Sequence, residues 1–478
     1  MKLALIHPPE PMLSIATEVC QHPINLAQLA AFVRERLGVD VELWDYGVLP
    51  YSPDHLRAQL HRFAPEIVGF NAMTPLIKTA AKMAAIVKDH NPDMLTIVGG
   101  PHVSAIPERT LAEFASFDLG VIGEGENTLA EICTAVKIGE HQPRGIKGTI
   151  RRQDGALVRE APRELIANLD DLPFPARDLI DFSLYQGSSS PGLSSKLRNI
   201  TELFTSRGCP VHCFFCGSYV THQGKVRFRS ARHVLSEVRE CVTRYGVDHF
   251  TIDDDTFTYG RERLIEICEG LRELGASWDC DSRVNNVDQE LLNQMAAGGC
   301  AKIAFGVESG SPRILELVRK RITLPQIEAA FIAARRARIL TSAFIMIGAH
   351  PTETWEEVEQ TFKLMRRIKP DFVMVYIAVP YPGTDLNEMM AREGLIDSED
   401  WDEYDIVRGE PCWRTFNFEA DDLIRLQRSM YRRIYLQPAF IWRKIKLLRS
   451  TDDLRYFSDA FIKFIKYIFG RRREQLSS

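Results

Sequence analysis

The sequence has no uninterrupted apolar run of about 20 residues, the length that a helix needs to cross a bilayer, so we expect no membrane-spanning segment. It has no excess of basic residues either. Its 59 lysines and arginines stand against 64 acidic residues, a net charge of -5, which predicts no general affinity for nucleic acid. The apolar stretch at the N-terminus is too short for a secretion signal and is typical of a first strand. Ten cysteines without such a signal indicate a reducing compartment, and the cytoplasm is the expected location.

The two paired C-x-x-C units of a zinc ribbon are also absent. Most of the cysteines are scattered, but Cys209, Cys213 and Cys216 stand at the spacing C-x-x-x-C-x-x-C. Three thiolates on one loop can hold three irons of a 4Fe-4S cluster, which normally takes four cysteines. No fourth cysteine lies nearby, so one iron would keep an open coordination position, as catalytic metal sites do. The alternatives are a zinc site or ordinary buried thiols. An open iron on a low-potential cluster can pass one electron to its ligand, which indicates radical chemistry.

Residues 1–140 alternate short β-rich runs with amphipathic helical stretches. Strands are predicted at residues 2–6, 39–44, 67–71, 95–98 and 119–122, with helices at 26–37 and 77–89 among them. This alternation is typical of parallel βαβ units. Five such strands suit a flavodoxin-like (Rossmann-type) α/β sheet, which binds its ligand at the carboxyl ends of the strands.

Residues 141–196 lack sustained periodicity and are predicted to connect two domains. The stretch contains the pattern of a hairpin at 148–158, and a run of serines and glycines predicts mobility around 188–195.

A second alternating series occupies residues 197–385. Strands are predicted at 200–205, 249–253, 278–283, 302–307, 341–347 and 372–379, and helices at 231–245, 261–274, 288–297, 324–338 and 353–368. Six units predict a partial (β/α)6 barrel, in which active groups gather at the carboxyl ends of the strands. The three-cysteine loop directly follows the first of these strands.

Residues 386–478 are predicted to be helical, and the stretch from 425 to 473 is basic with interleaved aromatic side chains. The favoured interpretation is a helical cap that packs its apolar stripe on the barrel. The alternative is a peripheral contact with an anionic membrane surface, which would suit a lipid-like substrate.

The cysteine loop with a six-unit barrel behind it resembles the radical S-adenosylmethionine (SAM) superfamily, and the preceding α/β domain resembles that of its cobalamin-binding subfamily. The resemblance covers residues 1 to about 385 and implies three cofactors: a 4Fe-4S cluster, SAM and cobalamin. It further implies that the open iron chelates SAM and that cleavage of SAM gives a 5'-deoxyadenosyl radical. An external electron donor such as flavodoxin or ferredoxin is implied as a partner.

The resemblance also assigns roles to residues near the ends of the barrel strands. It places Phe215 near the adenine, Glu308 at the ribose hydroxyls and Lys320 at the methionine carboxylate. Further SAM-binding or substrate-binding candidates at strand ends are Asp254, Arg283 and Ser309.

The N-terminal domain resembles cobalamin domains of the methionine-synthase type only in part. Gly99 and Gly100, with His102 after them, match a Gly-Gly element that lets the backbone approach a nucleotide-like tail. Asn71 occupies the first position of an S-x-L element and departs from it, and Gly123 with Glu124 matches a recurrent turn. The D-x-H-x-x-G motif, whose histidine lies beneath cobalt, is absent.

Two interpretations of that absence stay open. Either cobalamin binds without a protein histidine beneath cobalt, or the domain is a scaffold that has lost its cofactor. His22 and His102 lack the expected spacing, so each is interpreted as a hydrogen-bonding loop residue rather than as a cobalt ligand.

With both cofactors, the simplest implied reaction is methylation of an unactivated carbon of a hydrophobic or natural-product substrate. Oxidative cyclisation or rearrangement without methyl transfer is the first alternative. A non-catalytic cobalamin sensor or scaffold is the alternative from a different class, and the intact cysteine loop argues against it.

Overall fold

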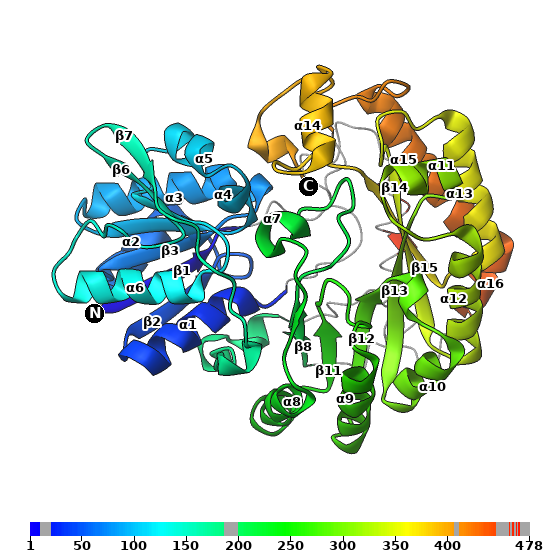
Figure 1. Ribbon diagram of the computed structural model, residues 1–478, viewed down its shortest axis with the longest axis horizontal. Coiled ribbons are helices and arrows are strands. Elements are labelled where there is room, and N and C mark those ends of the chain that lie inside the picture. Colours follow the sequence, from blue (N-terminus) through cyan, green and yellow to red (C-terminus); the bar gives the residue numbers. More distant parts are fainter. Residues whose placement is uncertain are drawn as a thin grey trace.

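The computed structural model describes residues 1–9, 21–185, 199–405 and 411–445, together with residues 458, 461, 462, 465, 467 and 468. Two largely parallel sheets lie next to each other, the N-terminal one in blue and cyan and the second in green and yellow (Figure 1). The predicted mobile stretch 188–195 and residues 446–457 of the basic tail fall outside the described residues. No helix within the described ranges combines the length and the apolarity needed to cross a membrane.

The N-terminal sheet has seven strands in the order β2-β1-β3-β4-β5-β6-β7. The first five are parallel and follow the predicted flavodoxin-like order: β1 (Lys2–His7), β2 (Asp40–Asp45), β3 (Ile67–Asn71), β4 (Leu95–Gly99) and β5 (Leu119–Val121). The hairpin predicted within the connection is instead part of this sheet, because β6 (Thr149–Gln153) pairs antiparallel with β5 and then with β7 (Ala156–Arg159). The N-terminal unit therefore continues beyond the expected boundary at residue 140.

Helices cover both faces of this sheet because successive side chains of a strand point to opposite faces (Figure 1). Helices α1 (Ile24–Leu37) and α6 (Glu126–Lys137) pack on the face that carries Leu3 and Leu5. On the face that carries Ala4 and Ile6, α2 (Pro53–Phe63) and α3 (Ile77–His90) pack instead. The short helices α4 (Pro101–Ala105) and α5 (Pro107–Glu113) follow β4.

The second sheet is the predicted partial barrel. Its six parallel strands run in the order β15-β14-β13-β12-β11-β8: β8 (Ile200–Leu203), β11 (His249–Ile252), β12 (Ser277–Ser282), β13 (Cys300–Glu308), β14 (Leu340–Ile347) and β15 (Phe372–Ile377). The barrel stays open, since β8 and β15 do not pair with each other. The outer helices are α8 (Ala231–Tyr245), α9 (Arg261–Glu273), α10 (Gln289–Ala297), α11 (Pro312–Leu317), α12 (Leu324–Arg336) and α13 (Trp355–Ile368), of which α11 was not predicted. Between β8 and α8 lie the strands β9 (Ser206–Arg207) and β10 (Arg227–Phe228), with α7 (Ser218–His222) between them.

The inside of the barrel, called the lumen below, has two chemically different walls. Alternate residues of each strand are buried under the outer helices, so the residues between them face the lumen. On β14 and β15 the lumen-facing side chains include four that are apolar or aromatic: Phe344, Met346, Met374 and Tyr376. On and just after β11 and β12 they include three carboxylic acids: Asp253, Asp279 and Asp281.

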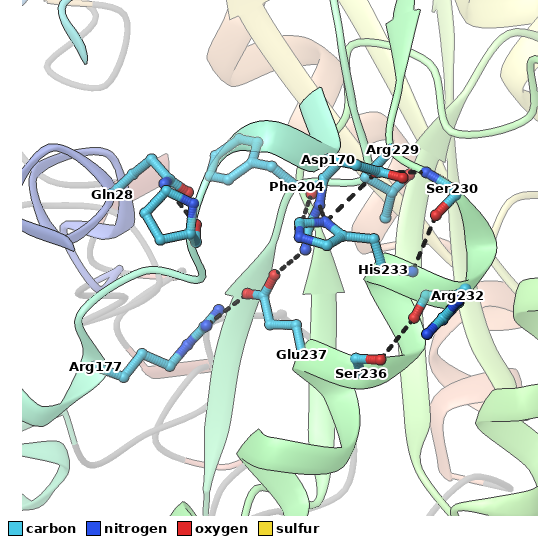
Figure 2. A network of polar contacts seen from close by, with 12 residues as sticks. Gln28, Asp170, Arg177, Phe204, Arg229, Ser230, Arg232, His233, Ser236 and Glu237 are labelled. Carbon is cyan, nitrogen blue, oxygen red and sulfur yellow. Dashed lines mark hydrogen bonds and ion pairs between the residues drawn. The ribbon is translucent and has the colours of Figure 1, made fainter. Parts of the chain in front are cut away.

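The connection between the two units is anchored on the barrel by buried charges (Figure 2). Arg177 of the connection forms an ion pair with Glu237 of α8 at 2.5 Å, and the same carboxylate pairs with Arg229 at 2.5 Å. Arg229 Nε donates to His233 Nδ1, and that ring lies 3.6 Å from the Asp170 carboxylate. Breaking a buried pair by removing one partner costs about 3–5 kcal/mol, so these contacts fix the connection against α8.

The C-terminal region after α14 (Asp385–Arg392) covers the free edge of β15. Tyr435 and Tyr431 of α15 (Ala420–Tyr435) accept hydrogen bonds at their hydroxyls from the backbone N–H groups of Val373 and Val375. The helix α16 (Pro438–Ile445) follows it. These contacts hold α15 on the edge of the barrel, and they satisfy backbone donors that an edge strand would otherwise expose.

Candidate active site

The three cysteines lie on a hairpin at the carboxyl end of β8. Strands β9 and β10 pair antiparallel and form the neck of this hairpin, and Cys209, Cys213 and Cys216 lie beyond it. All three are free thiols. The neck needs glycine at position 208, where φ is +94°, because a Cβ there would lie 2.1 Å from the Lys225 carbonyl oxygen.

Cys213 and Cys216 share one buried environment. Burial, with a smaller contribution from Cys213, raises the pKa of Cys216 to about 11. Burial likewise raises the pKa of Cys213, with Cys209 adding to the effect, while Lys320 lowers both values. The thiols must lose these protons to ligate iron. Among the described residues, no three His, Cys, Asp or Glu side chains converge on the position of a single ion. The fit of a 4Fe-4S cluster therefore rests on the shared loop and the mutual influence of the three thiols.

Two consecutive aspartates after β11 hold this hairpin in place. The carboxylate of Asp254 accepts hydrogen bonds from the backbone N–H groups of Thr205 and Ser206 and from the Ser206 hydroxyl, at 2.6, 3.0 and 2.7 Å. It is buried, so Asp254 supports the loop from below and does not face a ligand, contrary to the role expected for it. Asp255 is exposed instead and accepts a hydrogen bond from the Gly208 N–H at 3.0 Å.

Glu308 and Lys320 face each other, whereas the resemblance had given them separate roles. Lys320 Nζ lies 2.6 Å from Glu308 Oε1, and the two residues are only 8% and 5% exposed. A β-bulge between Gly306 and Glu308 re-aims the carboxylate, and Glu308 has a φ of +61°, which is uncommon outside glycine. Bulges and such strained residues cluster at functional sites.

The remaining barrel candidates surround this pair or support it. Arg283 is buried and donates a hydrogen bond to the Lys320 carbonyl oxygen. Ser309 is fully buried and accepts a hydrogen bond from the Ser311 N–H at 3.1 Å, so it braces the turn. Phe215 is partly buried and packs against the apolar cluster that contains Ile314 and Val318. The structure thus brings Arg283, Glu308 and Lys320 together beside the cysteines and leaves Ser309 behind them.

A cleft of about 510 Å³ separates the cysteine hairpin from the N-terminal sheet. The N-terminal wall is apolar and comes from the loops after β3 and β4: Met73, Pro75, Leu76, Pro101 and Ala105. The barrel wall is more polar and comes from the hairpin and from Asp255: Cys216, Ser218, Thr221 and His222. Sequence reasoning missed His222, which belongs to no motif, whereas Met73 lies at the third position of the S-x-L element that begins at Asn71.

The N-terminal residues expected to bind cobalamin support the cleft without lining it. Gly100 has a φ of +113°, and a Cβ there would lie 2.7 Å from the Ala72 carbonyl oxygen and 2.9 Å from Asn71 Oδ1. Asn71 and Gly99 end β3 and β4 and pair in register. The glycines therefore let the two loops pack closely, and the loops present their apolar residues to the cleft. Such an apolar wall at the carboxyl edge of the sheet fits a cobalamin macrocycle.

His102 and His22 are both hydrogen-bonded and enclosed, as interpreted from the sequence. His102 is 1% exposed, its Nδ1 lies 3.2 Å from the Thr74 hydroxyl, and its ring meets Trp401 edge-on at 4.9 Å. Burial lowers the pKa of His102 to about 4. His22 Nδ1 lies 2.9 Å from Glu202 on β8. Neither ring belongs to the walls of the cleft.

Glu124 does not face the cleft either, which corrects its assignment as a cofactor-binding residue. Its carboxylate forms ion pairs with Arg207 and Arg227 of the cysteine hairpin, each at 2.9 Å. The preceding Gly123, with φ +77°, donates its N–H to Ser104 at 3.0 Å. This turn therefore connects the two units.

Comparisons with known proteins find matches for both units of the chain. The B12 binding domain model matches residues 12–133, and the Radical SAM superfamily model matches residues 203–365. An uncharacterized methyltransferase of Pyrococcus horikoshii is 33% identical over 448 residues, which cover 93% of this chain and 95% of the relative. An anaerobic magnesium-protoporphyrin IX monomethyl ester cyclase of Rubrivivax gelatinosus is 27% identical over 94% of this chain and 80% of its own. The radical SAM methyltransferase TsrM of Kitasatospora setae, solved with cobalamin and a 4Fe-4S cluster, matches 98% of this chain and 88% of its own, with a TM-score of 0.68 at 18% identity.

Proposed function

The chain belongs to the radical SAM enzymes that carry a cobalamin-binding domain, and we propose that it methylates an unactivated carbon of a small hydrophobic molecule. Its cofactors are a 4Fe-4S cluster, SAM and cobalamin. When bound, they supply a methyl group and a radical that removes hydrogen from carbon. The protein's own residues hold these groups in register and keep water from the reaction.

The cleft is the observation that carries this proposal. Cys216 lies on one wall, and the loops after β3 and β4 form the other. A ligand of the cluster and the carboxyl edge of the cobalamin-type sheet therefore face the same space. This arrangement serves a reaction that uses both cofactors on one substrate. A scaffold that has lost its cofactor would not need both walls of this cleft.

Within the barrel, the Glu308–Lys320 pair is our candidate for holding SAM. A carboxylate accepts two hydroxyl donors, and an ammonium pairs with a carboxylate. Both side chains are already charged, buried and adjacent, so SAM would exchange one ion pair for two new contacts rather than leave a buried charge alone.

The lumen supports a substrate with an apolar body. Phe344, Met346 and Tyr376 offer an apolar surface on one side. On the other side, burial between the barrel walls, together with neighbouring carboxylates, raises the pKa of Asp253 to about 8 and that of Asp281 to about 7. Asp281 is nevertheless open to water in the lumen. Hydrogen-bond donors or a positive charge on the substrate would suit this side.

Product analysis tests the proposed reaction. The anaerobically reconstituted enzyme, with cobalamin, reductant and SAM carrying a labelled methyl group, is incubated with an extract of small molecules and lipids. Methylation predicts equal amounts of S-adenosylhomocysteine and 5'-deoxyadenosine, together with a labelled product. Formation of 5'-deoxyadenosine alone, with no label transferred, would contradict the proposal.

Cyclisation or oxidation without methyl transfer is the second candidate, and one finding favours it. The cyclase of Rubrivivax gelatinosus is 27% identical over most of both chains. The same experiment separates the two reactions, because a cyclase forms no S-adenosylhomocysteine.

An external electron donor and a membrane contact of the C-terminal tail stay predictions. Ile441, Trp442 and Ile445 of α16 are exposed apolar side chains. Flotation with vesicles that contain anionic lipid, at low salt, tests the membrane contact, and a protein that stays with the lipid-free fraction would contradict it.

A further inference from the structure

The neck of the cysteine hairpin carries two like charges in direct opposition. Strands β9 and β10 pair so that Arg207 lies directly opposite Arg227. Like charges at directly opposed positions of an antiparallel pair destabilise the pairing. The pairing of β9 and β10 at the base of the hairpin therefore needs negative charge from elsewhere in the protein to balance the two arginines.

Glu124 of the N-terminal unit lies between these two arginines. Its Oε1 is 2.9 Å from Arg207 Nη1, and its Oε2 is 2.9 Å from Arg227 Nη1, so each oxygen binds one strand of the neck. Glu126, at the start of α6, lies 2.5 Å from the other terminal nitrogen of Arg207. Two carboxylates thus balance two guanidinium groups, and both glutamate side chains are only 5% exposed.

The same turn also holds the connection between the two units. Glu124 Oε2 accepts a hydrogen bond from the Ile166 N–H at 2.8 Å, and Arg227 donates to the Ile166 carbonyl oxygen at 2.8 Å. Burial works against a charged Glu124, but Arg227, Arg207 and the Ile166 N–H outweigh it and lower its pKa to about 2. The carboxylate therefore stays charged throughout the physiological pH range.

The two arginines of the neck connect it to two parts of the site, a cysteine and the wall of the cleft. Arg207 is followed by Gly208 and then by the ligand candidate Cys209. Arg227 Nη2 lies 3.3 Å from Nδ1 of His222, which belongs to the wall of the cleft. A shift of the neck would therefore move both a cysteine and a residue that faces the cobalamin side.

We propose that the turn at residues 123–126 of the cobalamin-binding domain closes the neck of the cysteine hairpin, so that docking of the two domains fixes where the cluster loop lies. Glu124 and Glu126 are then positioning residues that act through Arg207 and Arg227 and touch neither cofactor nor substrate. Their effect on the reaction rests on the proposed function, but their effect on the hairpin does not.

Hydrogen-deuterium exchange of the chain without cofactors tests the structural part. The Glu124→Gln variant keeps the shape of the side chain and removes its charge. We expect backbone amides of residues 205–228 to exchange about tenfold faster, because the neck opens more often. Glu131→Gln is the matched control: Glu131 lies on α6, the helix that follows the turn, but its side chain is 51% exposed and pairs with Arg163 away from the neck. Equal protection of the hairpin in both variants would overturn the proposal.

A second measurement separates positioning from a general loss of stability. With SAM and reduced cobalamin, formation of S-adenosylhomocysteine needs both domains in register, whereas cleavage to 5'-deoxyadenosine needs the barrel alone. The Glu126→Gln variant removes one contact only and keeps the test available if Glu124→Gln does not fold. We expect it to lower the ratio of the first product to the second at unchanged iron content, and an unchanged ratio would overturn the positioning role. Absence of S-adenosylhomocysteine in the unaltered enzyme would instead refute the proposed methylation.

Discussion

The space beside Gly306 allows a sharp test of the Glu308–Lys320 pair. A Cβ at position 306 would lie 2.6 Å from Glu308 Oε1 and 2.6 Å from Lys320 Nζ. Real Cβ atoms essentially never approach other heavy atoms so closely. Both charged ends are flexible in principle, but they are buried, so neither can swing into water when Gly306→Ala introduces the methyl group.

The size of the effect follows from overpacking a core. Forcing an extra methyl group into a well-packed site costs about 1–3 kcal/mol, which is about 5-fold to 150-fold in the folding equilibrium. Anaerobic urea unfolding of the chain without cofactors, followed by tryptophan fluorescence, measures this loss of stability. The variant should unfold at a lower urea midpoint than the wild type. Since the chain has more than one domain, the transition that belongs to the barrel is compared rather than a single overall value.

Gly217→Ala is the control for this measurement. Gly217 has a φ of -77°, and a Cβ there meets no atom within 4 Å, so its midpoint should stay at the wild-type value. If Gly306→Ala unfolds at the same urea concentration as the control, the two charges are not held where the structure places them. The reasoning about SAM contacts would then fail with it.

Three further predictions concern the cysteines, cobalt and the interdomain glutamate. Cys213→Ala should abolish SAM cleavage because a cluster ligand is lost, and retained cleavage in an anaerobic assay would refute the assignment. His102→Gln should leave the EPR spectrum of bound cob(II)alamin unchanged, whereas loss of a nitrogen splitting would identify this histidine as a cobalt ligand. The pKa of Glu124 is lowered from 4.5 to about 2, so its stabilisation is present above pH 4.5 and is lost as the pH falls toward 2. The difference in urea midpoint between wild type and Glu124→Gln should therefore be constant from about pH 5 to 7 and shrink in acid.

The strands and the cysteine loop could be predicted because their signals are local. Alternating apolar residues and helical periodicity give the β1–β5 and barrel strands within a few residues of their ends. The cysteine spacing identifies a metal loop from chemistry alone. The hairpin of β6 and β7 was recognised, but its own pattern does not say which sheet it joins.

The site residues were harder to predict because their partners are distant in the sequence. Glu124 follows a strand end, where a ligand contact is the usual expectation, yet its partners Arg207 and Arg227 are more than 80 residues away. No local sequence pattern near Glu308 predicts the β-bulge that turns its side chain toward Lys320. Local patterns fix secondary structure, whereas the pairing of charges depends on how the two units dock.

The burial of His102 behind Trp401 has a consequence for biosynthesis. The indole N–H of Trp401 donates to the carboxylate of Glu113, and Arg109 stacks on the indole ring. Part of the N-terminal unit is therefore covered by a side chain that is synthesised much later. At about 5–20 residues per second, a ribosome needs roughly 15 to 60 seconds to add the about 300 residues between the histidine and the tryptophan. During that interval the surface of the N-terminal domain that receives Trp401 stays uncovered. We expect His102 of ribosome-bound chains to stay open to solvent until the segment with Trp401 has emerged and covers it.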